Sequence, residues 1–295
     1  MSSPRQRNQV RYVVITPARN EAQHIENTIA SMVRQSLTPR QWVIVNDGSE
    51  DGTADIVQRH IQRVPWMTLV QRPNRGFREP GVGVVQAFYE GYGSIHPHDW
   101  EFLVKLDADL SFASDYFQRC FEAFETNPRL GICGGTVCHQ QNGTLLPERC
   151  PAFHVRGATK IYRRKCWDDI GGLPRITGWD TVDEVKANML GWQTASLPHV
   201  KIVHHRYTGS ADGSWQNAVK NGRANYIAGY HPLFMLAKCL KRLPERPFVI
   251  GAIGLLCGFI SGYLRRIPQL DDREVIRYLR QQQIQRLLLR ETIWK

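Results

Sequence analysis

Two aspartates one residue apart, Asp107 and Asp109, directly follow an apolar-rich run over residues 102–106. On an extended segment that leaves a strand, alternate side chains point the same way. Both carboxylates can therefore reach one hard cation at about 2.1–2.5 Å, directly or through water, and such a pair suits a metal-bound diphosphate. An isolated Asp-x-Asp is more often a solvated turn. Its position after the fourth predicted strand of an α/β pattern favours metal binding here.

Polar side chains also follow two earlier predicted strands. The strand predicted over residues 10–16 leads into the segment 17–21, and the strand over residues 42–46 leads into the segment 46–53. In open α/β sheets ligands bind outside the carboxyl ends of the strands, so we expect these segments to face one crevice. Crowded carboxylates repel one another unless they bind a cation or hydrogen-bond donors such as ribose hydroxyls and a base imino group. The segment 46–53 taken alone fits an ordinary turn with helix caps equally well.

The segments between these strands have helical periodicity. Ile25, Ile29, Met32 and Val33 recur at i, i+4, i+7 and i+8, which predicts a helix over about residues 21–35 and a βαβ crossover. We expect strand and helix to alternate through about residue 110, and the second half to build the far wall of a cleft. The other predicted strands cover residues 67–71, 102–106, 131–137 and 201–204, and the other helices begin near residues 53, 113 and 181.

Four motifs follow these strands: Val14–Glu21, Val43–Ser49 with Asp51–Thr53, Asn74–Gly76 and Leu106–Asp109. Together they resemble the successive signatures of the family 2 glycosyltransferases with the GT-A fold, over roughly residues 10–210. The resemblance implies a Rossmann-like α/β fold with a mostly parallel central sheet and flanking helices. It also implies a divalent cation, Mn or Mg, a nucleotide-sugar donor with UDP-sugar favoured, and transfer by single displacement with inversion.

The resemblance assigns roles to the donor-site residues. Asp47 contacts the base or ribose, Asp107 contacts ribose and metal, and Asp109 bridges metal and diphosphate. Asn46 stands where the family usually has a second Asp, which changes one hydrogen-bond contact without removing the site. The nucleotide pocket is lined by Pro17, Asn20 and Glu21. Three nearby arginines, Arg72, Arg75 and Arg78, either face the diphosphate or are exposed.

The second half is expected to supply the base. Gly171–Leu173 and Gly178–Glu184 resemble the family's Gly-Gly-Phe and Glu-Asp signatures, in which an Asp at a helix start deprotonates the acceptor hydroxyl. Trp179 replaces the usual Glu, so the base is Asp180 or Asp183, and we favour Asp180. Both aspartates also fit a helix cap.

Two histidines, His204 and His205, end the last predicted strand. Because side chains alternate along a strand, only one of them can face the cleft. The family fold often offers a His to the metal or diphosphate at this point, and we assign His204 as the metal ligand. Arg206 or Lys201 is an alternative partner for the leaving diphosphate.

The chain carries a formal charge of +11, and residues 231–295 hold 12 Lys and Arg against 5 Asp and Glu, which predicts a polyanionic partner. We expect a catalytic domain over residues 1–230, with a nucleotide-binding half at about 10–110 and an acceptor half at about 111–210. Residues 231–295 are expected to form a basic amphipathic and hydrophobic helical region.

The run from Phe248 to Leu264 has no charged residue and forms a helix of about 26 Å, a borderline membrane span. It contains Gly254, Gly258 and Gly262 at four-residue intervals, the close-packing motif of membrane helices. Leucines from Leu233 to Leu243 recur at helical spacing and suit a helix in a membrane interface. The alternative is an ordinary buried helix pair that covers the catalytic domain.

The remaining composition limits the compartment. The first 11 residues have no apolar run, so we expect no cleavable signal peptide and a location at the cytoplasmic face of a membrane. Seven scattered cysteines without a Cys-x-x-Cys pair are expected to be reduced core thiols.

The sequence therefore predicts a glycosyltransferase of polysaccharide or glycolipid synthesis that uses a nucleotide-sugar and a glycan or lipid-linked acceptor, and no nucleic acid. One alternative is a sugar nucleotidyltransferase, but the segment 17–21 is not the Gly-rich basic loop that such an enzyme needs. The other is a basic lipid- or nucleic-acid-binding protein without catalysis, which leaves the acidic strand ends unexplained.

Overall fold

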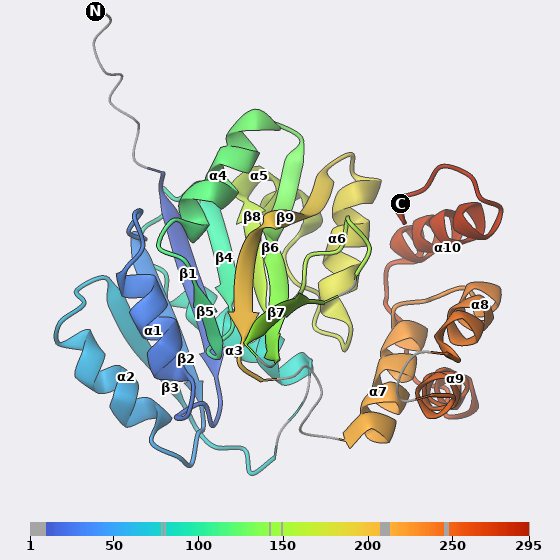
Figure 1. The fold of residues 1–295 in the computed structure, drawn as a ribbon, viewed down its shortest axis with the longest axis horizontal. Coiled ribbons are helices and arrows are strands. Elements are labelled where there is room, and N and C mark those ends of the chain that lie inside the picture. The colour runs from blue at the N-terminus through green and yellow to red at the C-terminus, as the bar shows by residue number, and fades with distance from the viewer. Residues whose placement is uncertain are drawn as a thin grey trace, which may run out of the picture.

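The structure is a computed structural model that describes residues 10–294, apart from residues 78, 80, 142, 149, 207–212 and 245–247. Figure 1 shows a central sheet with helices on both faces and a group of C-terminal helices to one side. The strands are β1 (Tyr12–Ala18), β2 (Gln41–Asp47), β3 (Met67–Arg72), β4 (Phe102–Leu106), β5 (Leu110–Phe112), β6 (Leu130–Gln141), β7 (Thr144–Pro147), β8 (Thr159–Arg163) and β9 (Gln193–His204). The helices are α1 (Ile25–Val33), α2 (Thr53–Ile61), α3 (Val82–Gly93), α4 (Tyr116–Thr126), α5 (Arg164–Ile170), α6 (Trp179–Met189), α7 (Gly213–Ile227), α8 (Pro232–Arg242), α9 (Ile250–Leu264) and α10 (Arg273–Leu287).

The strands form one sheet in the order β3-β2-β1-β4-β8-β6-β9-β5, with β7 paired to β6. The first four strands are parallel, and Ile15 of β1 lies in register between Val43 of β2 and Lys105 of β4. The α/β prediction is confirmed, and the parallel half ends at β4 because β8 joins it antiparallel. The carboxyl ends of β1, β2 and β4 therefore meet at one edge of the sheet, as a site at that edge requires.

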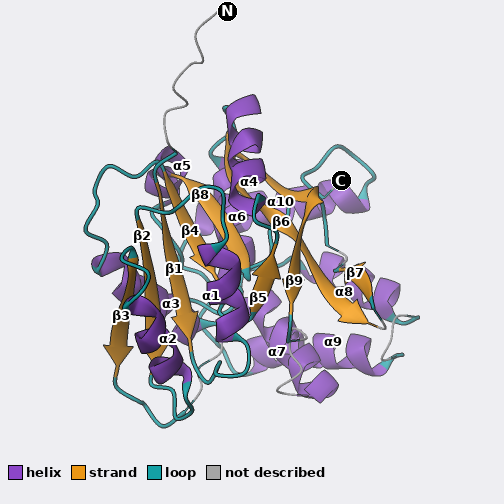
Figure 2. Ribbon diagram, turned by 60° about the vertical axis from the view of Figure 1, so that its left-hand side comes forward, coloured by secondary structure: helices purple, strands orange, loops and turns teal. Residues whose placement is uncertain are grey.

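Two hydrophobic cores cover the two faces of the sheet. One contains apolar residues of α1, α2 and α4, and the other contains apolar residues of α3, α5 and α6. Figure 2 shows α1 in front of the strands. Because β1 and β2 are buried on both faces, their central residues form continuous apolar runs over residues 12–15 and 42–45, without alternation.

The C-terminal helices have a core of their own, to which α6 contributes Val182 and Val185. Helix α9 lies directly against α7 along its glycines. A Cβ at Gly258 would lie 1.9 Å from the Val219 carbonyl oxygen, so only glycine permits this approach. The glycine motif thus packs two helices of the same chain. The predicted domain boundary at residue 230 stays a prediction.

Helix α9 has 15 residues, which span about 22 Å. Of the helices in the described ranges, none has both the length and the hydropathy needed to cross a bilayer. All seven cysteines are free and five are buried, but Cys150 is partly exposed and Cys257 is exposed, so the expectation of core thiols is wrong for these two.

Candidate active site

The loops after β1 and β2 are held together by hydrogen bonds. The Asn20 side-chain oxygen accepts from the Glu50 amide at 2.9 Å, and the Asn20 amide donates to the Ser49 hydroxyl at 3.0 Å. Asn20 has φ of 55°, a left-handed conformation that Asn tolerates better than most residues. Pro17 lies opposite Val45 in the β1–β2 register. The structure therefore places Pro17 and Asn20 at the strand end where the sequence predicts the nucleotide pocket.

Asp47, at the end of β2, is buried between two arginines. Arg72 contacts one carboxylate oxygen at 2.5 Å and Arg75 contacts the other at 2.7 Å. These two arginines are thus neither isolated nor freely exposed, while Arg78 lies outside the described residues. In this arrangement both oxygens of Asp47 already have donors, which a ligand would have to replace or share.

Asp107 and Asp109 converge with His204 beyond the end of β4. Their ligand atoms all lie within 4.8 Å of one another, and the His204 Nε2 atom lies 3.1 Å from the Asp109 carboxylate. The His204 Nδ1 atom is buried and has no hydrogen-bond partner in the described part of the chain. Two carboxylates and an imidazole are a suitable donor set for Mn²⁺, so these residues fit the predicted metal.

The charges around this cluster shift its pKa values in opposite directions. Burial and the neighbouring Asp109 raise the pKa of Asp107, although Lys105 opposes them. Burial opposes ionisation of Asp109 too, but the hydrogen bond and charge of His204, together with the charges of Arg206 and Lys105, lower the pKa of Asp109. A cation bound beside Asp107 and Asp109 would therefore favour the ionised form of Asp107.

The neighbouring basic residues have separate positions. Arg206 contacts Glu21 at 2.6 Å and lies 4.0 Å from the Asp109 carboxylate, so it links the end of β1 to the Asp-x-Asp. His205 faces away, because its ring lies 2.7 Å from the Ser111 hydroxyl. The pairing of β9 with β5 thus brings the side chain of His204 to the Asp109 carboxylate, whereas His205 meets Asp109 only through its backbone amide, which donates to the Asp109 carbonyl at 3.0 Å.

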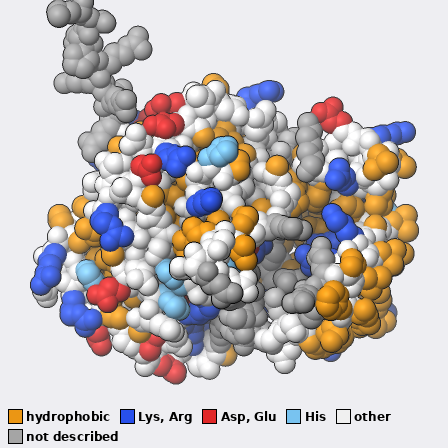
Figure 3. Space-filling model, in the orientation of Figure 1, with side chains coloured by type: hydrophobic (Ala, Val, Ile, Leu, Met, Phe, Trp, Pro, Cys, Tyr) orange, Lys and Arg blue, Asp and Glu red, His pale blue; other side chains and the backbone are white. Residues whose placement is uncertain are grey.

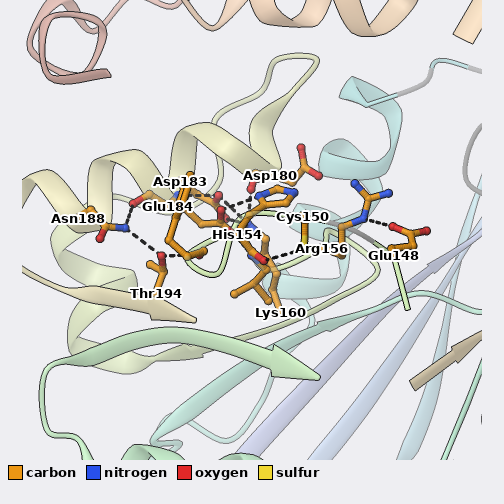
Figure 4. A network of polar contacts seen from close by, with 12 residues as sticks. Glu148, Cys150, His154, Arg156, Lys160, Asp180, Asp183, Glu184, Asn188 and Thr194 are labelled. Carbon is orange, nitrogen blue, oxygen red and sulfur yellow. Dashed lines mark hydrogen bonds and ion pairs between the residues drawn. The ribbon is translucent and has the colours of Figure 1, made fainter. Parts of the chain in front are cut away.

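The far wall of the site carries the two candidate bases on α6, and their surroundings differ (Figure 4). Asp183 is 1% exposed, and its carboxylate accepts from Lys160 at 2.8 Å and from the Tyr162 hydroxyl at 2.6 Å. Asp180 is partly exposed, and no described residue donates a hydrogen bond to its carboxylate. Asp180 is therefore available to an incoming hydroxyl, whereas Asp183 is enclosed.

The pKa directions sharpen this contrast. Burial raises the pKa of Asp183 to about 6, and Lys160 only partly offsets it. At Asp180 burial acts in the same direction, but surrounding positive charges outweigh it and lower the pKa; they belong to His154, Lys160, Arg156 and Lys105. A pKa near neutrality suits a general base. A base must first lie within hydrogen-bonding distance of the acceptor hydroxyl, and of the two aspartates only Asp180 is accessible to one.

Buried lysines are the residues that the motifs did not reveal. Lys105 of β4 and Lys160 of β8 are paired in register, and their ammonium groups lie 5.6 and 5.4 Å from the Trp179 ring. Lys105 contacts Asp107 and the Gly157 carbonyl, and a Cβ at Gly157 would lie 3.2 Å from the Asp180 carboxylate. Lys105 and Gly157 thus link Asp107 to Asp180. For Lys105, a charged residue inside an otherwise apolar strand was the available signal, whereas β8, which reads Thr-Lys-Ile-Tyr-Arg, offered none for Lys160.

A sheet of this order, with acidic clusters at its strand ends and a carboxylate on the facing helix, is typical of glycosyltransferases with the GT-A fold. The family model described as glycosyl transferase family 2 matches residues 13–171, more than half of the chain. The protein is therefore a glycosyltransferase and belongs to family 2. The matched segment includes Asp107 and Asp109 and ends before α6 and His204.

Sequence relatives cover part of the chain. Poly-β-1,6-N-acetyl-D-glucosamine synthase of Staphylococcus epidermidis is 28% identical over 127 residues, which are 43% of this chain and 28% of that protein. The uncharacterized glycosyltransferase EpsJ of Bacillus subtilis is 28% identical over 147 residues, 48% of this chain and 39% of that one. The match thus spans well under half the length of these relatives.

Solved structures share the fold. The mannosyltransferase PcManGT of Pyrobaculum calidifontis, in complex with GDP-Man and Mn²⁺, superposes with a TM-score of 0.57 at 18% identity, over 90% of this chain and 78% of that one. TarS of S. aureus in complex with UDP superposes with a TM-score of 0.53 at 16% identity, over 87% of this chain and 72% of that one.

Proposed function

We propose that this glycosyltransferase moves a sugar from a nucleotide-sugar donor, with UDP-sugar favoured, to a hydroxyl of a glycan or lipid-linked acceptor. Transfer depends on a divalent cation, inverts the anomeric centre and serves polysaccharide or glycolipid synthesis. One observation carries the proposal: Asp107, Asp109 and His204 converge, and Lys105, which contacts Asp107, also contacts the carbonyl of Gly157, beside which the uncommitted carboxylate of Asp180 lies.

The similar proteins support the donor and the pathway in general terms. TarS structures exist with UDP and with UDP-GlcNAc, and the PcManGT structure holds GDP-Man and Mn²⁺. The staphylococcal relative is named as a polysaccharide synthase. UDP is the donor nucleotide we favour, and Mn²⁺ is the ion we would try first.

In the proposed donor complex, Asp107, Asp109 and His204 hold the cation, which when bound neutralises charge on the departing diphosphate. Arg206 adds positive charge beside Asp109, from which it lies 4.0 Å. Asp47 accepts hydrogen bonds from the base or ribose, and Pro17, Asn20 and Glu21 line the same pocket. These roles use charges that the strand ends already bring together.

Asp180 acts as the base in the proposed displacement. The acceptor oxygen bonds to the anomeric carbon as the bond from that carbon to the diphosphate oxygen breaks, and the electron pair leaves with the nucleoside diphosphate. The hydroxyl proton passes to the Asp180 carboxylate, which its lowered pKa keeps ionised at neutral pH. One displacement without a covalent enzyme intermediate inverts the configuration.

The first test is thermal shift and donor hydrolysis with UDP-, GDP- and dTDP-sugars, each with Mn²⁺, Mg²⁺ or EDTA. We expect one nucleotide class to stabilise the wild type only when metal is present, and Asp109→Asn to lose the response together with about 10³-fold or more of the rate. Asp115→Asn is the matched control, because Asp115 is exposed and its side chain caps no helix amide.

A folded wild type that responds to no nucleotide would overturn the donor assignment. A response that survives EDTA would remove the metal from the proposal and leave the nucleotide. NMR of the product reports the stereochemistry, and a retained anomeric configuration would exclude single displacement.

A further inference from the structure

Helices α8 and α9 carry an apolar surface that the rest of the described chain leaves uncovered. Four leucines of α8 and its C-cap form one stripe and are 38–59% exposed: Leu233, Leu236, Leu240 and Leu243. A matching stripe on α9 is 45–80% exposed: Ile250, Ile253, Ile260 and Leu264. Figure 3 shows hydrophobic side chains gathered over these helices. We call these eight residues the apolar face.

The apolar face is additional to the core of the helical region. Helix α8 already buries Met235 and Cys239, and α9 already buries Leu255 and Phe259. The glycine side of α9 lies against α7. A helix that met water on its outer side would carry polar residues there, and monomeric proteins rarely expose apolar patches of this extent.

Basic residues accompany the apolar face. The sequence from residue 232 to residue 266 has six Lys and Arg against one acidic residue, Glu245. The exposed ones gather where the two helices end, at Lys241, Arg242, Arg265 and Arg266. An apolar stripe edged by cations complements a bilayer surface, where acyl chains lie beneath phosphate headgroups.

Other occupants fit this surface less well. Nucleic acid needs cations across the contact surface, and here leucine and isoleucine occupy its centre. A second copy bound through the same face would surround one apolar contact with a second set of the same cations, and their charges would repel one another. An anionic bilayer satisfies both the apolar residues and the cations.

We propose that α8 and α9 lie in the interface of an anionic membrane, with the apolar face toward the acyl chains and the basic ends on lipid phosphates. Helix α9 is too short to span the bilayer and lies in its plane. The proposal does not depend on the chemistry of the strand ends. It would place this glycosyltransferase where a lipid-linked acceptor resides.

Co-sedimentation of the full chain with vesicles tests the proposal. The vesicles contain phosphatidylcholine alone or an equal mixture of phosphatidylcholine and phosphatidylglycerol. We expect binding to the anionic vesicles that weakens as salt rises, and at least about tenfold weaker binding of Leu236→Glu with Leu240→Glu. Val33→Glu on α1 is the matched control, because Val33 is 49% exposed and Leu236 is 48% exposed.

Each contrary outcome is decisive. Wild-type protein that stays in the supernatant with anionic vesicles, or binds both vesicles equally, would overturn the proposal, and so would a double variant that binds like Val33→Glu. Sedimentation equilibrium without lipid tests whether a second copy binds this surface. A wild type that is dimeric, with a double variant that is monomeric, would assign the surface to a second copy. The unfolding temperature of each variant without donor reports on its folding. The shift of that temperature on adding the donor reports separately on the donor site.

Discussion

Two buried lysines lie side by side on neighbouring strands, but the carboxylates that they contact differ. Lys105 of β4 contacts Asp107, whose side chain is 30% exposed, at the edge of the sheet. Lys160 of β8 contacts Asp183 and Glu184, whose side chains are fully enclosed. Both regions contain a lysine–carboxylate ion pair. They differ because solvent and ligands can reach the carboxylate of Asp107 and cannot reach those of Asp183 and Glu184.

We expect this difference to separate a carboxylate that binds a ligand from a structural one. A ligand or cation from solvent can reach Asp107 and share it with Lys105 without opening the core. Nothing can replace Lys160 in that way, because removing one partner of a buried ion pair leaves an uncompensated charge that costs about 3–5 kcal/mol. We therefore use the accessibility of the carboxylate, and not the presence of an ion pair, to predict where chemistry takes place.

The largest expected effect belongs to Asp180, which lies between the two regions. Asp180→Asn should lower kcat by about 10²–10⁴-fold, because an amide cannot take the acceptor proton. Its free energy of unfolding should change by less than about 1 kcal/mol, since no described side chain is hydrogen-bonded to the carboxylate. Turnover and donor affinity measured on the same preparation separate a chemical defect from a binding defect. Full activity in this variant would rule out Asp180 as the base.

Asp183→Asn, one helical turn away, should show the opposite behaviour. We expect a loss of about 3 kcal/mol in the free energy of unfolding, at the lower end for a broken buried pair because Lys160 keeps its 2.8 Å contact with Glu184. Urea denaturation measures the loss, with Asp180→Asn as the control on the same helix. A change below about 1 kcal/mol, or a stable variant without activity, would show that Asp183 belongs to the chemistry.

Local sequence predicted the parallel half of the fold better than the antiparallel half. The strands β1, β2 and β4 have apolar-rich runs, so their pattern is visible without knowledge of their neighbours. Strand β8 reads Thr-Lys-Ile-Tyr-Arg, and its extended conformation depends on pairing with β4 and β6, which are distant in sequence. Helix α7 was not predicted either, because its few buried residues include the glycine that contacts α9.

The same limit applied to the site. Alternation along β9 indicated that one histidine faces the cleft, but the register of β9 against β5 selects His204. Likewise, Asp180 and Asp183 are equivalent in the sequence as carboxylates at a helix start. The structure distinguishes them, because Lys160 of β8 contacts Asp183. Motifs predicted which residue types gather at the strand ends, and long-range pairing decides which members of each pair are accessible.

The smallest predicted effect tests whether Lys105 shares Asp107 with a cation. Lys105→Met removes a positive charge next to the proposed metal ligands at nearly constant volume, so Mn²⁺ should bind about tenfold more tightly. The stabilisation of the protein by increasing Mn²⁺ concentrations, followed by thermal shift, measures this affinity without activity. Lys160→Met is the matched control and should lower the unfolding temperature in the absence of metal while leaving the Mn²⁺ affinity unchanged. Weaker Mn²⁺ binding in Lys105→Met would mean that Lys105 orients Asp107 for the metal and does not compete with it. Both lysines would then serve to hold a carboxylate in place.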